Sequence, residues 1–152
     1  MSHKMPLFKF EKNPEWPAHL SITEADWYSP QWQMQNSLKS ESDFAAYFDL
    51  ANDERSVFNV ADELFNIRCT PYYAALAKNK PHHPIRKILM PNQNELTSPH
   101  QEMLDPLGEK VNQKTKRLIH RYSDRALLLI TDFCSVYCRY CTRKHFTGQD
   151  QV

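Results

Sequence analysis

Apolar residues recur at helical spacing through the first half of the chain. Phe44, Tyr47 and Phe48 follow this spacing between positions 43 and 50, and a longer stretch covers positions 52 to 68. Residues 23–38 also predict a helix, which Pro30 must break or kink because proline lacks a backbone N–H. The longer helix is expected to bury a face made of Val57, Phe58, Ala61, Leu64, Phe65 and Arg68.

Local signals indicate where these helices begin. Thr23 has an acidic residue three positions later, a pattern typical of an N-terminal cap. Asn52 is the expected cap of the longer helix. Thr70 followed by Pro71 predicts another start, because proline fits the first helical position. We therefore expect residues 1–117 to form a mainly helical region.

The pattern changes in the second half of the chain. The run Ala126–Ile130 is apolar without alternation, which predicts a strand buried on both faces, as in a parallel sheet or barrel. The stretch before it, residues 110–117, is basic and polar and predicts a solvated face or loop. The fold class is therefore expected to be α/β, with residues 118–152 forming a first strand and the loop that follows it.

Composition narrows the class of protein. The 152 residues suit one modest domain, and 19 Lys+Arg against 18 Asp+Glu give no bulk charge for binding nucleic acid or a membrane surface. The longest apolar run is too short to span a bilayer, and the first residues lack the apolar segment of a signal peptide, which predicts a cytoplasmic protein. Only two glycines exclude a glycine-rich nucleotide loop and, with ten prolines, favour short helices over a hairpin-rich sheet.

Three of the four cysteines form the motif C-x3-C-x2-C, namely Cys134, Cys138 and Cys141. Cys thiolates bind structural zinc and iron–sulfur clusters, whereas a disulfide framework is unexpected without an export signal. With His145 the set would be Cys3His, which suits zinc. Without it, three thiolates hold three irons of a cubane and leave the fourth iron open for a substrate.

The position of the motif favours the cluster over zinc. The motif directly follows the predicted strand, at the sheet edge where barrel enzymes place their chemistry. The fourth cysteine, Cys69, is interpreted as a buried free thiol, with a fourth ligand as the alternative. The His82–His83 pair lies in a polar, proline-rich stretch and is interpreted as exposed to solvent.

The motif and the residues around it resemble a known family. An aromatic residue before the last cysteine, here Tyr140, resembles the signature of radical S-adenosylmethionine enzymes. The wider string over residues 120–146 is similar to the lysine 2,3-aminomutase family, as are the segments Thr70–Tyr73, Asp105–Leu107 and Trp27–Gln33. The resemblance runs from about residue 27 onward and is strongest after residue 118.

The resemblance implies a radical S-adenosylmethionine (β/α) barrel and an isomerase that moves an amino group from C2 to C3 of an amino acid. The implied cofactors are a [4Fe-4S] cluster, S-adenosylmethionine and pyridoxal 5′-phosphate, and a homo-oligomer is expected for the complete enzyme. Without the resemblance, Arg121 and Arg125 would be interpreted as surface partners of Asp124. The implied roles are cluster ligation by Cys134, Cys138 and Cys141, adenine contact near Tyr140, phosphate binding by Arg121, Tyr122 and Arg125, and substrate carboxylate binding by Arg143.

A complete barrel takes roughly 200 residues or more, whereas one strand is predicted here. We therefore expect an N-terminal fragment of such an enzyme, inactive by itself. Two alternatives stay open, a small zinc-binding interaction module and an inert gene remnant. Lysine, glutamate and arginine are all possible substrates within the resembled family.

Overall fold

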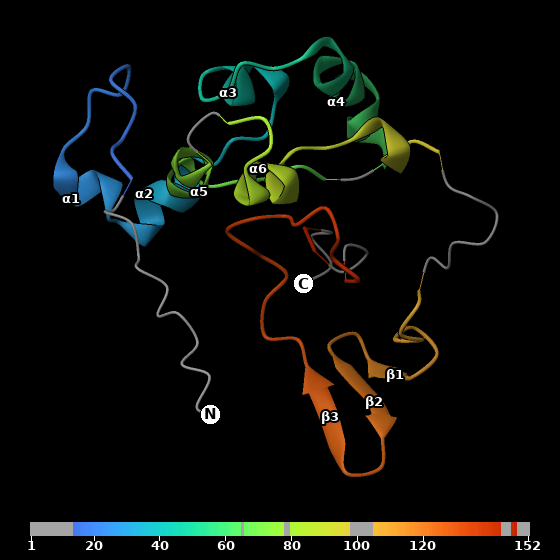
Figure 1. Cartoon of the computed structure of the whole chain (residues 1–152). Coiled ribbons are helices and arrows are strands. Elements are labelled where there is room, and N and C mark those ends of the chain that lie inside the picture. The colour runs from blue at the N-terminus through green and yellow to red at the C-terminus, as the bar shows by residue number, and fades with distance from the viewer. Residues whose placement is uncertain (1–13, 65, 78–79, 98–104, 144–146, 149–152) are drawn as a thin grey trace, which may run out of the picture.

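A computed structural model describes residues 14–64, 66–77, 80–97, 105–143 and 147–148, apart from the side chains of 61–64. Short helices form one part of the described chain and a small sheet forms another (Figure 1). None of the described helices is both long and apolar enough to cross a membrane. The elements are α1 Glu24–Trp27, α2 Pro30–Gln35, α3 Glu41–Ala45, α4 Asn52–Leu64, α5 Pro71–Leu76, α6 Pro84–Leu89, the 3-10 helix η1 Gln93–Glu95, β1 Gln113–Thr115, β2 Leu118–Tyr122 and β3 Arg125–Leu128.

Two helices, α1 and α5, start at the predicted caps. Thr23 and the acidic residue three positions later form a capping box at α1, and Pro30 breaks the predicted helix by opening α2 at its first position. The start of α5 at Thr70 is also confirmed, although the Thr70 hydroxyl makes no capping hydrogen bond. The prediction for Asn52 was wrong by one position, because Asn52 is itself the first residue of α4.

Helices α3, α4, α5 and α6 contribute to one apolar core. Val57 and Phe58 are buried in it, as predicted for the face of α4. Cys69 is also fully buried and free, which confirms its interpretation as a structural thiol. Val136 reaches this core from the cysteine motif, far along the chain from the helices. The core comprises Leu38, Phe44, Phe48, Leu50, Val57, Phe58, Ile67, Cys69, Ala74, Ala77, Leu89, Met90 and Val136.

The strands form an antiparallel sheet in the order β1-β2-β3. β2 and β3 make a hairpin in which Leu118 lies opposite Leu128 and Tyr122 lies opposite Arg125. The described chain has mostly short helices and one small sheet, which agrees with the expectation of short helices over a hairpin-rich sheet; two polar residues, serine and aspartate, make the turn of this hairpin. β1 falls within residues 110–117, for which a solvated face or loop is predicted. The loop prediction was wrong over these three residues, whereas the solvated face agrees with side chains that are exposed or half-buried.

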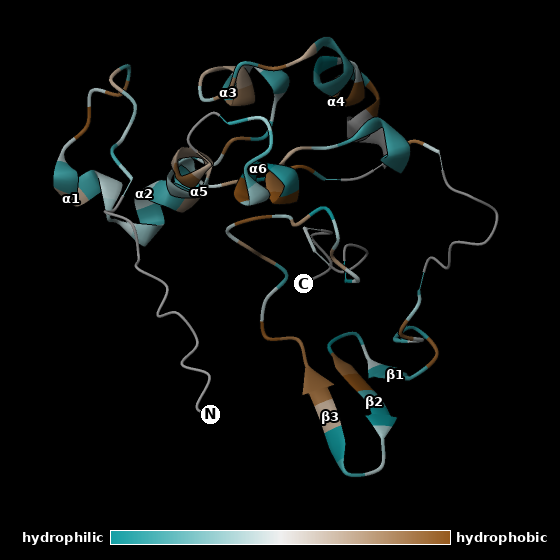
Figure 2. Ribbon diagram, in the orientation of Figure 1, coloured by the Kyte–Doolittle hydropathy of each residue, from teal (hydrophilic) through white to brown (hydrophobic). Residues whose placement is uncertain are grey.

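The expected buried parallel strand was also wrong. β3 is antiparallel and lies at an edge of the sheet, and Leu128 and Ile130 are 61% and 82% exposed. Figure 2 shows that the hydrophobic end of β3 is its arrowhead, from which the chain continues toward the helices, whereas the end at the hairpin turn is hydrophilic. Within the described residues β3 pairs with β2 alone. The structure shows a mixed helix and strand fold, and the described residues do not form a barrel.

After β3 the chain returns to the helices (Figure 1). Cys69 makes antiparallel bridges to Leu38 on one side and to Val136 on the other. The N–H of Thr70 donates to the carbonyl of Ser135 at 2.9 Å, and the N–H of Tyr137 donates to the carbonyl of Arg68 at 2.9 Å, as expected for antiparallel pairing. We call these three segments, Leu38, residues 68–70 and residues 135–137, the ribbon. The ribbon attaches the cysteine motif to the helical region.

Candidate functional site

The structure places the three motif cysteines on one loop. Cys134 is exposed, whereas Cys138 and Cys141 are partly buried, and the N–H of Cys141 donates to the carbonyl of Cys138 at 3.0 Å. Although Cys134 is exposed overall, the buried part of its side chain raises the pKa of its thiol. The charges of the nearby Cys141 and Cys138 thiolates raise this pKa further. Among the described residues, however, no three Cys, His, Asp or Glu side chains are gathered into a group that could hold a metal. The loop therefore offers the right donors without a formed coordination site.

The other candidate metal ligands occupy different settings. His145 lies outside the described residues, so the Cys3His set stays a prediction. Burial raises the pKa of Cys69 far above its ordinary value, which disfavours the thiolate that a metal needs. His82 is exposed as predicted, whereas His83 is half-buried, because its imidazole caps α6 by accepting the N–H of Ile85 at 3.2 Å. The two histidines therefore have no partner in a metal site among the described residues.

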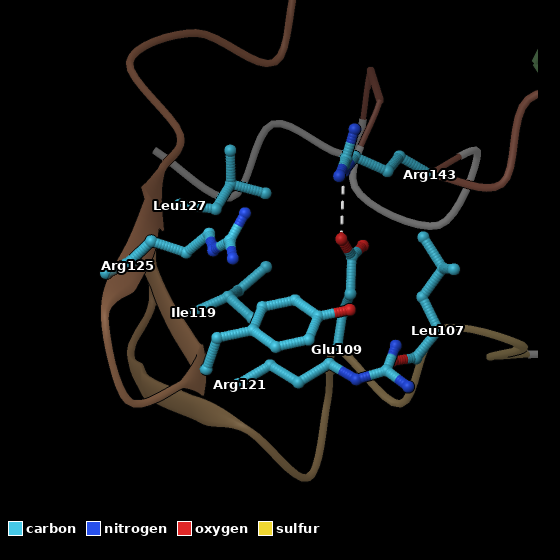
Figure 3. Close-up of a pocket in the computed structure, with 9 residues that line it drawn as sticks. Leu107, Glu109, Ile119, Arg121, Arg125, Leu127 and Arg143 are labelled. Atoms are coloured by element: carbon cyan, nitrogen blue, oxygen red, sulfur yellow. Dashed lines mark hydrogen bonds and ion pairs between the residues drawn. The ribbon is translucent and has the colours of Figure 1, made fainter.

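A cavity of about 320 Å³ lies between the hairpin, the turn around residue 108 and the cysteine loop (Figure 3). The structure brings Arg121, Tyr122, Arg125 and Arg143 together around it, which are the residues that the resemblance assigned to phosphate and carboxylate binding. We call this cavity the arginine pocket. Its lining residues are Leu107, Glu109, Ile119, Arg121, Tyr122, Arg125, Ala126, Leu127 and Arg143.

Two arginines of the pocket flank one aromatic ring. The guanidinium carbons of Arg121 and Arg125 lie 5.5 and 5.2 Å from the ring centroid of Tyr122. Arg121 also donates to the carbonyl of Leu107 at 2.6 Å. Arg125 pairs with Asp124 at 3.0 Å, so the surface interpretation holds for Arg125 and not for Arg121. An exposed pair of this kind contributes only about 0–1 kcal/mol and leaves Arg125 able to bind an anion.

Glu109 is a pocket residue that sequence reasoning missed. Its Oε1 accepts the Nε–H of Arg143 at 2.9 Å, and its side chain is only 5% exposed. The other oxygen, Oε2, is buried without a hydrogen-bond partner. The carboxylate of Asp105 accepts the N–H of Glu109 at 2.9 Å and thereby fixes the turn. The sequence predicts a turn at residues 105–109, but a turn pattern does not indicate which residue its glutamate contacts.

A second cavity, of about 250 Å³, lies beside the cysteines. Arg143 lines both cavities and so links the arginine pocket to the cysteine loop. Tyr140 lines neither cavity and is exposed, and the neighbouring Cys138 thiol raises the pKa of its hydroxyl. The residues of the second cavity are Lys116, Arg117, Leu129, Thr131, Asp132, Cys134, Cys141, Thr142, Arg143 and Thr147.

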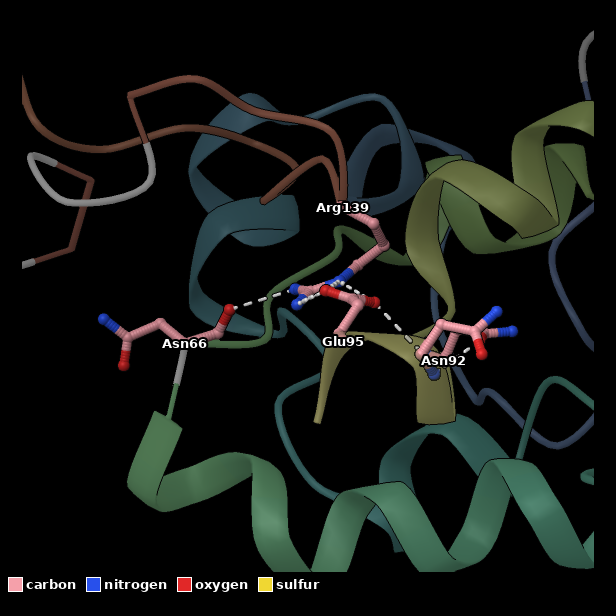
Figure 4. A network of polar contacts seen from close by, with 5 residues as sticks. Asn66, Asn92, Glu95 and Arg139 are labelled. Carbon is pink, nitrogen blue, oxygen red and sulfur yellow. Dashed lines mark hydrogen bonds and ion pairs between the residues drawn. The ribbon is translucent and has the colours of Figure 1, made fainter. Parts of the chain in front are cut away.

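Arg139 lies between two motif cysteines and anchors the loop to the helices (Figure 4). Its guanidinium donates to both carboxylate oxygens of Glu95 in η1, with a shortest distance of 2.6 Å, and to the carbonyl of Asn66. Its backbone N–H donates to the carbonyl of Ile88 at 3.0 Å. The Glu95 carboxylate also accepts the N–H of Asn92, which caps η1. Arg139 therefore has a structural partner, which the sequence did not predict.

Comparisons with known proteins identify relatives that match most of this chain. The chain is 38% identical over 129 residues to L-lysine 2,3-aminomutase of Clostridium subterminale and 40% identical over 129 residues to that of Fusobacterium nucleatum, which is 84% of this chain and 31% and 30% of those proteins. It is 30% identical over 131 residues, 86% of this chain, to the glutamate 2,3-aminomutase of Clostridioides difficile. No family model matches the chain. The resemblance seen in the sequence is thus confirmed: this chain is a homologue of the L-lysine 2,3-aminomutases over 84% of its length, and it spans about a third of the length of the curated relatives it matches.

Proposed function

We propose that this chain carries the cluster-binding and anion-binding part of a radical S-adenosylmethionine aminomutase. Such an enzyme moves an amino group from C2 to C3 of an amino acid and is an isomerase. The observation that carries the proposal is the arginine pocket, where Arg121, Tyr122, Arg125 and Arg143 converge. Arg143 also borders the cavity lined by Cys134 and Cys141, which links anion binding to the cysteine loop.

The arginine pocket fits a phosphate-bearing cofactor and a carboxylate. Planar guanidinium groups bind both anions through paired, charge-assisted hydrogen bonds, and a phenol adds one more donor. Arg121, Tyr122 and Arg125 would hold the phosphate of pyridoxal 5′-phosphate, and Arg143 would bind the carboxylate of the amino acid. When bound, this cofactor supplies an electron sink next to the migrating nitrogen. The protein's own part would be to hold both anions in this cavity, the phosphate from the hairpin and the carboxylate from the cysteine loop.

The cysteine loop fits an iron–sulfur cluster by the chemistry of its donors. Cys134, Cys138 and Cys141 would hold a [4Fe-4S] cluster, whose open iron is available to S-adenosylmethionine, with Tyr140 beside the adenine. When bound, the cluster supplies the electron that cleaves this cofactor. The loop residues contribute the thiolates, and the ribbon and Arg139 hold the loop backbone against the helices.

The names of the relatives favour lysine or glutamate as the amino acid. Turnover by these 152 residues alone is not expected, because a complete barrel takes roughly 200 residues or more. Binding of the cluster and of the phosphate group is expected, since the donors for both lie among the described residues.

Anaerobic reconstitution with iron and sulfide tests the proposal. We expect about four iron atoms per chain and a brown absorption band, both lost when Cys134, Cys138 or Cys141 is replaced by alanine. Cys69→Ala is the matched control, because Cys69 is buried outside the motif and should leave iron binding unchanged. One zinc atom per chain without the brown band would contradict the proposal and support a zinc-binding interaction module.

A further inference from the structure

Glu109 lies in the arginine pocket although its charge opposes the anions proposed to bind there (Figure 3). Only one of its oxygens has a partner, the Nε–H of Arg143 at 2.9 Å. The second oxygen is buried and unpaired, a situation that destabilises the folded state. Each such group in a folded protein calls for an explanation, and a role in the pocket supplies one.

The contact has a geometry that suits positioning. Glu109 holds Arg143 through Nε, and among the hydrogen bonds of the described residues this is the bond that fixes the Arg143 guanidinium. Among the described residues the terminal Nη groups have no hydrogen-bond partner, which leaves them for a ligand. The Arg143 side chain is 44% exposed, so without Glu109 it would exchange among many rotamers in solvent. A guanidinium ordered in advance loses less freedom when it binds a carboxylate in the paired geometry.

The turn that carries Glu109 is itself well fixed. Asp105 accepts the N–H groups of Glu109 and of the next residue, each at 2.9 Å. Gly108 adopts φ +61°, in the left-handed region that glycine enters without strain. The carbonyl of Leu107 in the same turn accepts a hydrogen bond from the guanidinium of Arg121. One turn therefore holds two arginines of the pocket, which come from β2 and from the cysteine loop.

We infer that Glu109 is a positioning residue for Arg143, which it holds so that the Nη groups of Arg143 receive the carboxylate of the amino acid ligand. This inference rests on the proposed function of the arginine pocket. A simple charge effect predicts the opposite sign, since a negative side chain near an anion weakens binding. The direction of the change on removing Glu109 therefore separates the two explanations.

Two probes test the inference by isothermal titration calorimetry with the full chain. The first is N-(5′-phosphopyridoxyl)-L-lysine, which carries both a phosphate and a carboxylate. The second is pyridoxamine 5′-phosphate, which carries the phosphate alone. We expect Glu109→Ala to weaken binding of the first probe by about tenfold and to leave the second nearly unchanged, as for loss of a charge-assisted contact. Glu109→Gln keeps an acceptor oxygen and should recover part of the loss. Glu15→Ala, at an exposed site outside the pocket, is the matched control.

The outcomes are distinct. A loss confined to the carboxylated probe, with partial recovery in Glu109→Gln, supports the inference. Unchanged or tighter binding of that probe by Glu109→Ala overturns it while the proposed pocket stands. Equal losses for both probes also overturn it, because Glu109 would then maintain the pocket as a whole. If the unmodified chain binds neither probe, the proposed phosphate site and the inference fail together.

Discussion

The ion pair between Arg139 and Glu95 should couple the cysteine loop to the helical region. It joins residues 44 positions apart, and the two side chains are only 10% and 21% exposed. We consider replacing each by glutamine and combining both changes in a double-mutant cycle. Glutamine at position 95 keeps an oxygen for the N–H that caps η1, so the cycle isolates the ion pair.

The magnitude follows from the burial and geometry of the pair. Two unit charges about 4 Å apart at an effective dielectric constant of about 20 attract by about 4 kcal/mol. Desolvation and side-chain ordering offset part of this attraction. The forked contact, with both carboxylate oxygens of Glu95 engaged, is of the stronger, charge-assisted kind. We expect a coupling free energy of about 2 kcal/mol, and a loss of about 2–3 kcal/mol for either single change.

Urea unfolding followed by tryptophan fluorescence measures the free energy of unfolding for the four proteins. The same cycle at Arg55 and Glu41 is a matched control, because that Arg–Glu pair is far more exposed. Its expected coupling is about 0.2–1 kcal/mol. Hydrogen exchange at the amide of Arg139, which donates to the carbonyl of Ile88, adds a local measure of whether the loop detaches.

Equal coupling energies for the two pairs would refute the reasoning, since burial would then have no effect. A coupling below about 1 kcal/mol for Arg139 and Glu95, together with unchanged exchange at the Arg139 amide, would show that the backbone bonds alone hold the loop.

Three further changes test other parts of the structure. Gln33→Leu removes a buried amide that bonds the carbonyl ending α1 at 2.7 Å and an N–H of α5 at 2.8 Å, and should lower the free energy of unfolding by about 2–4 kcal/mol in urea. Burial raises the pKa of Tyr47 from 10.0 to about 12, so the stabilisation it gives is complete below pH 10 and lost as the pH rises to 12; Tyr47→Phe should flatten that decline in urea midpoints. Iodoacetamide should modify exposed Cys134 in the native protein and Cys69 only after denaturation, as peptide mass analysis would show, and early modification of Cys69 would contradict its burial.

Sequence reasoning succeeded where the cause is local. The caps at Thr23 and Thr70 depend on residues within one helical turn, so their patterns predict the starts of α1 and α5. Burial of Cys69 followed from the general preference of a free cysteine for an apolar core. In each instance the residues that determine the outcome are close together in the sequence or act through their own chemistry.

It failed where the cause lies elsewhere in the chain. An apolar run such as 126–130 predicts side chains that become buried if another part of the protein packs on them. The run does not show which part packs there, and here Ile130 is exposed. Glu109 and Glu95 meet their arginines across 34 and 44 positions, which no short pattern encodes. The convergence of the pocket arginines was expected only through the resemblance, because single arginines are equally consistent with surface pairs.

The ribbon has a thermodynamic consequence. Because Cys69 shares backbone bridges with Leu38 in the helical region and with Val136 in the cysteine loop, ordering of the loop and folding of the helices are linked equilibria. A ligand that binds only the ordered loop must stabilise the helices too, by about 2.7 kcal/mol at a concentration 100 times its dissociation constant. The melting temperature of the helical region should therefore rise when any ligand binds only the ordered cysteine loop, even if that ligand gives no signal of its own.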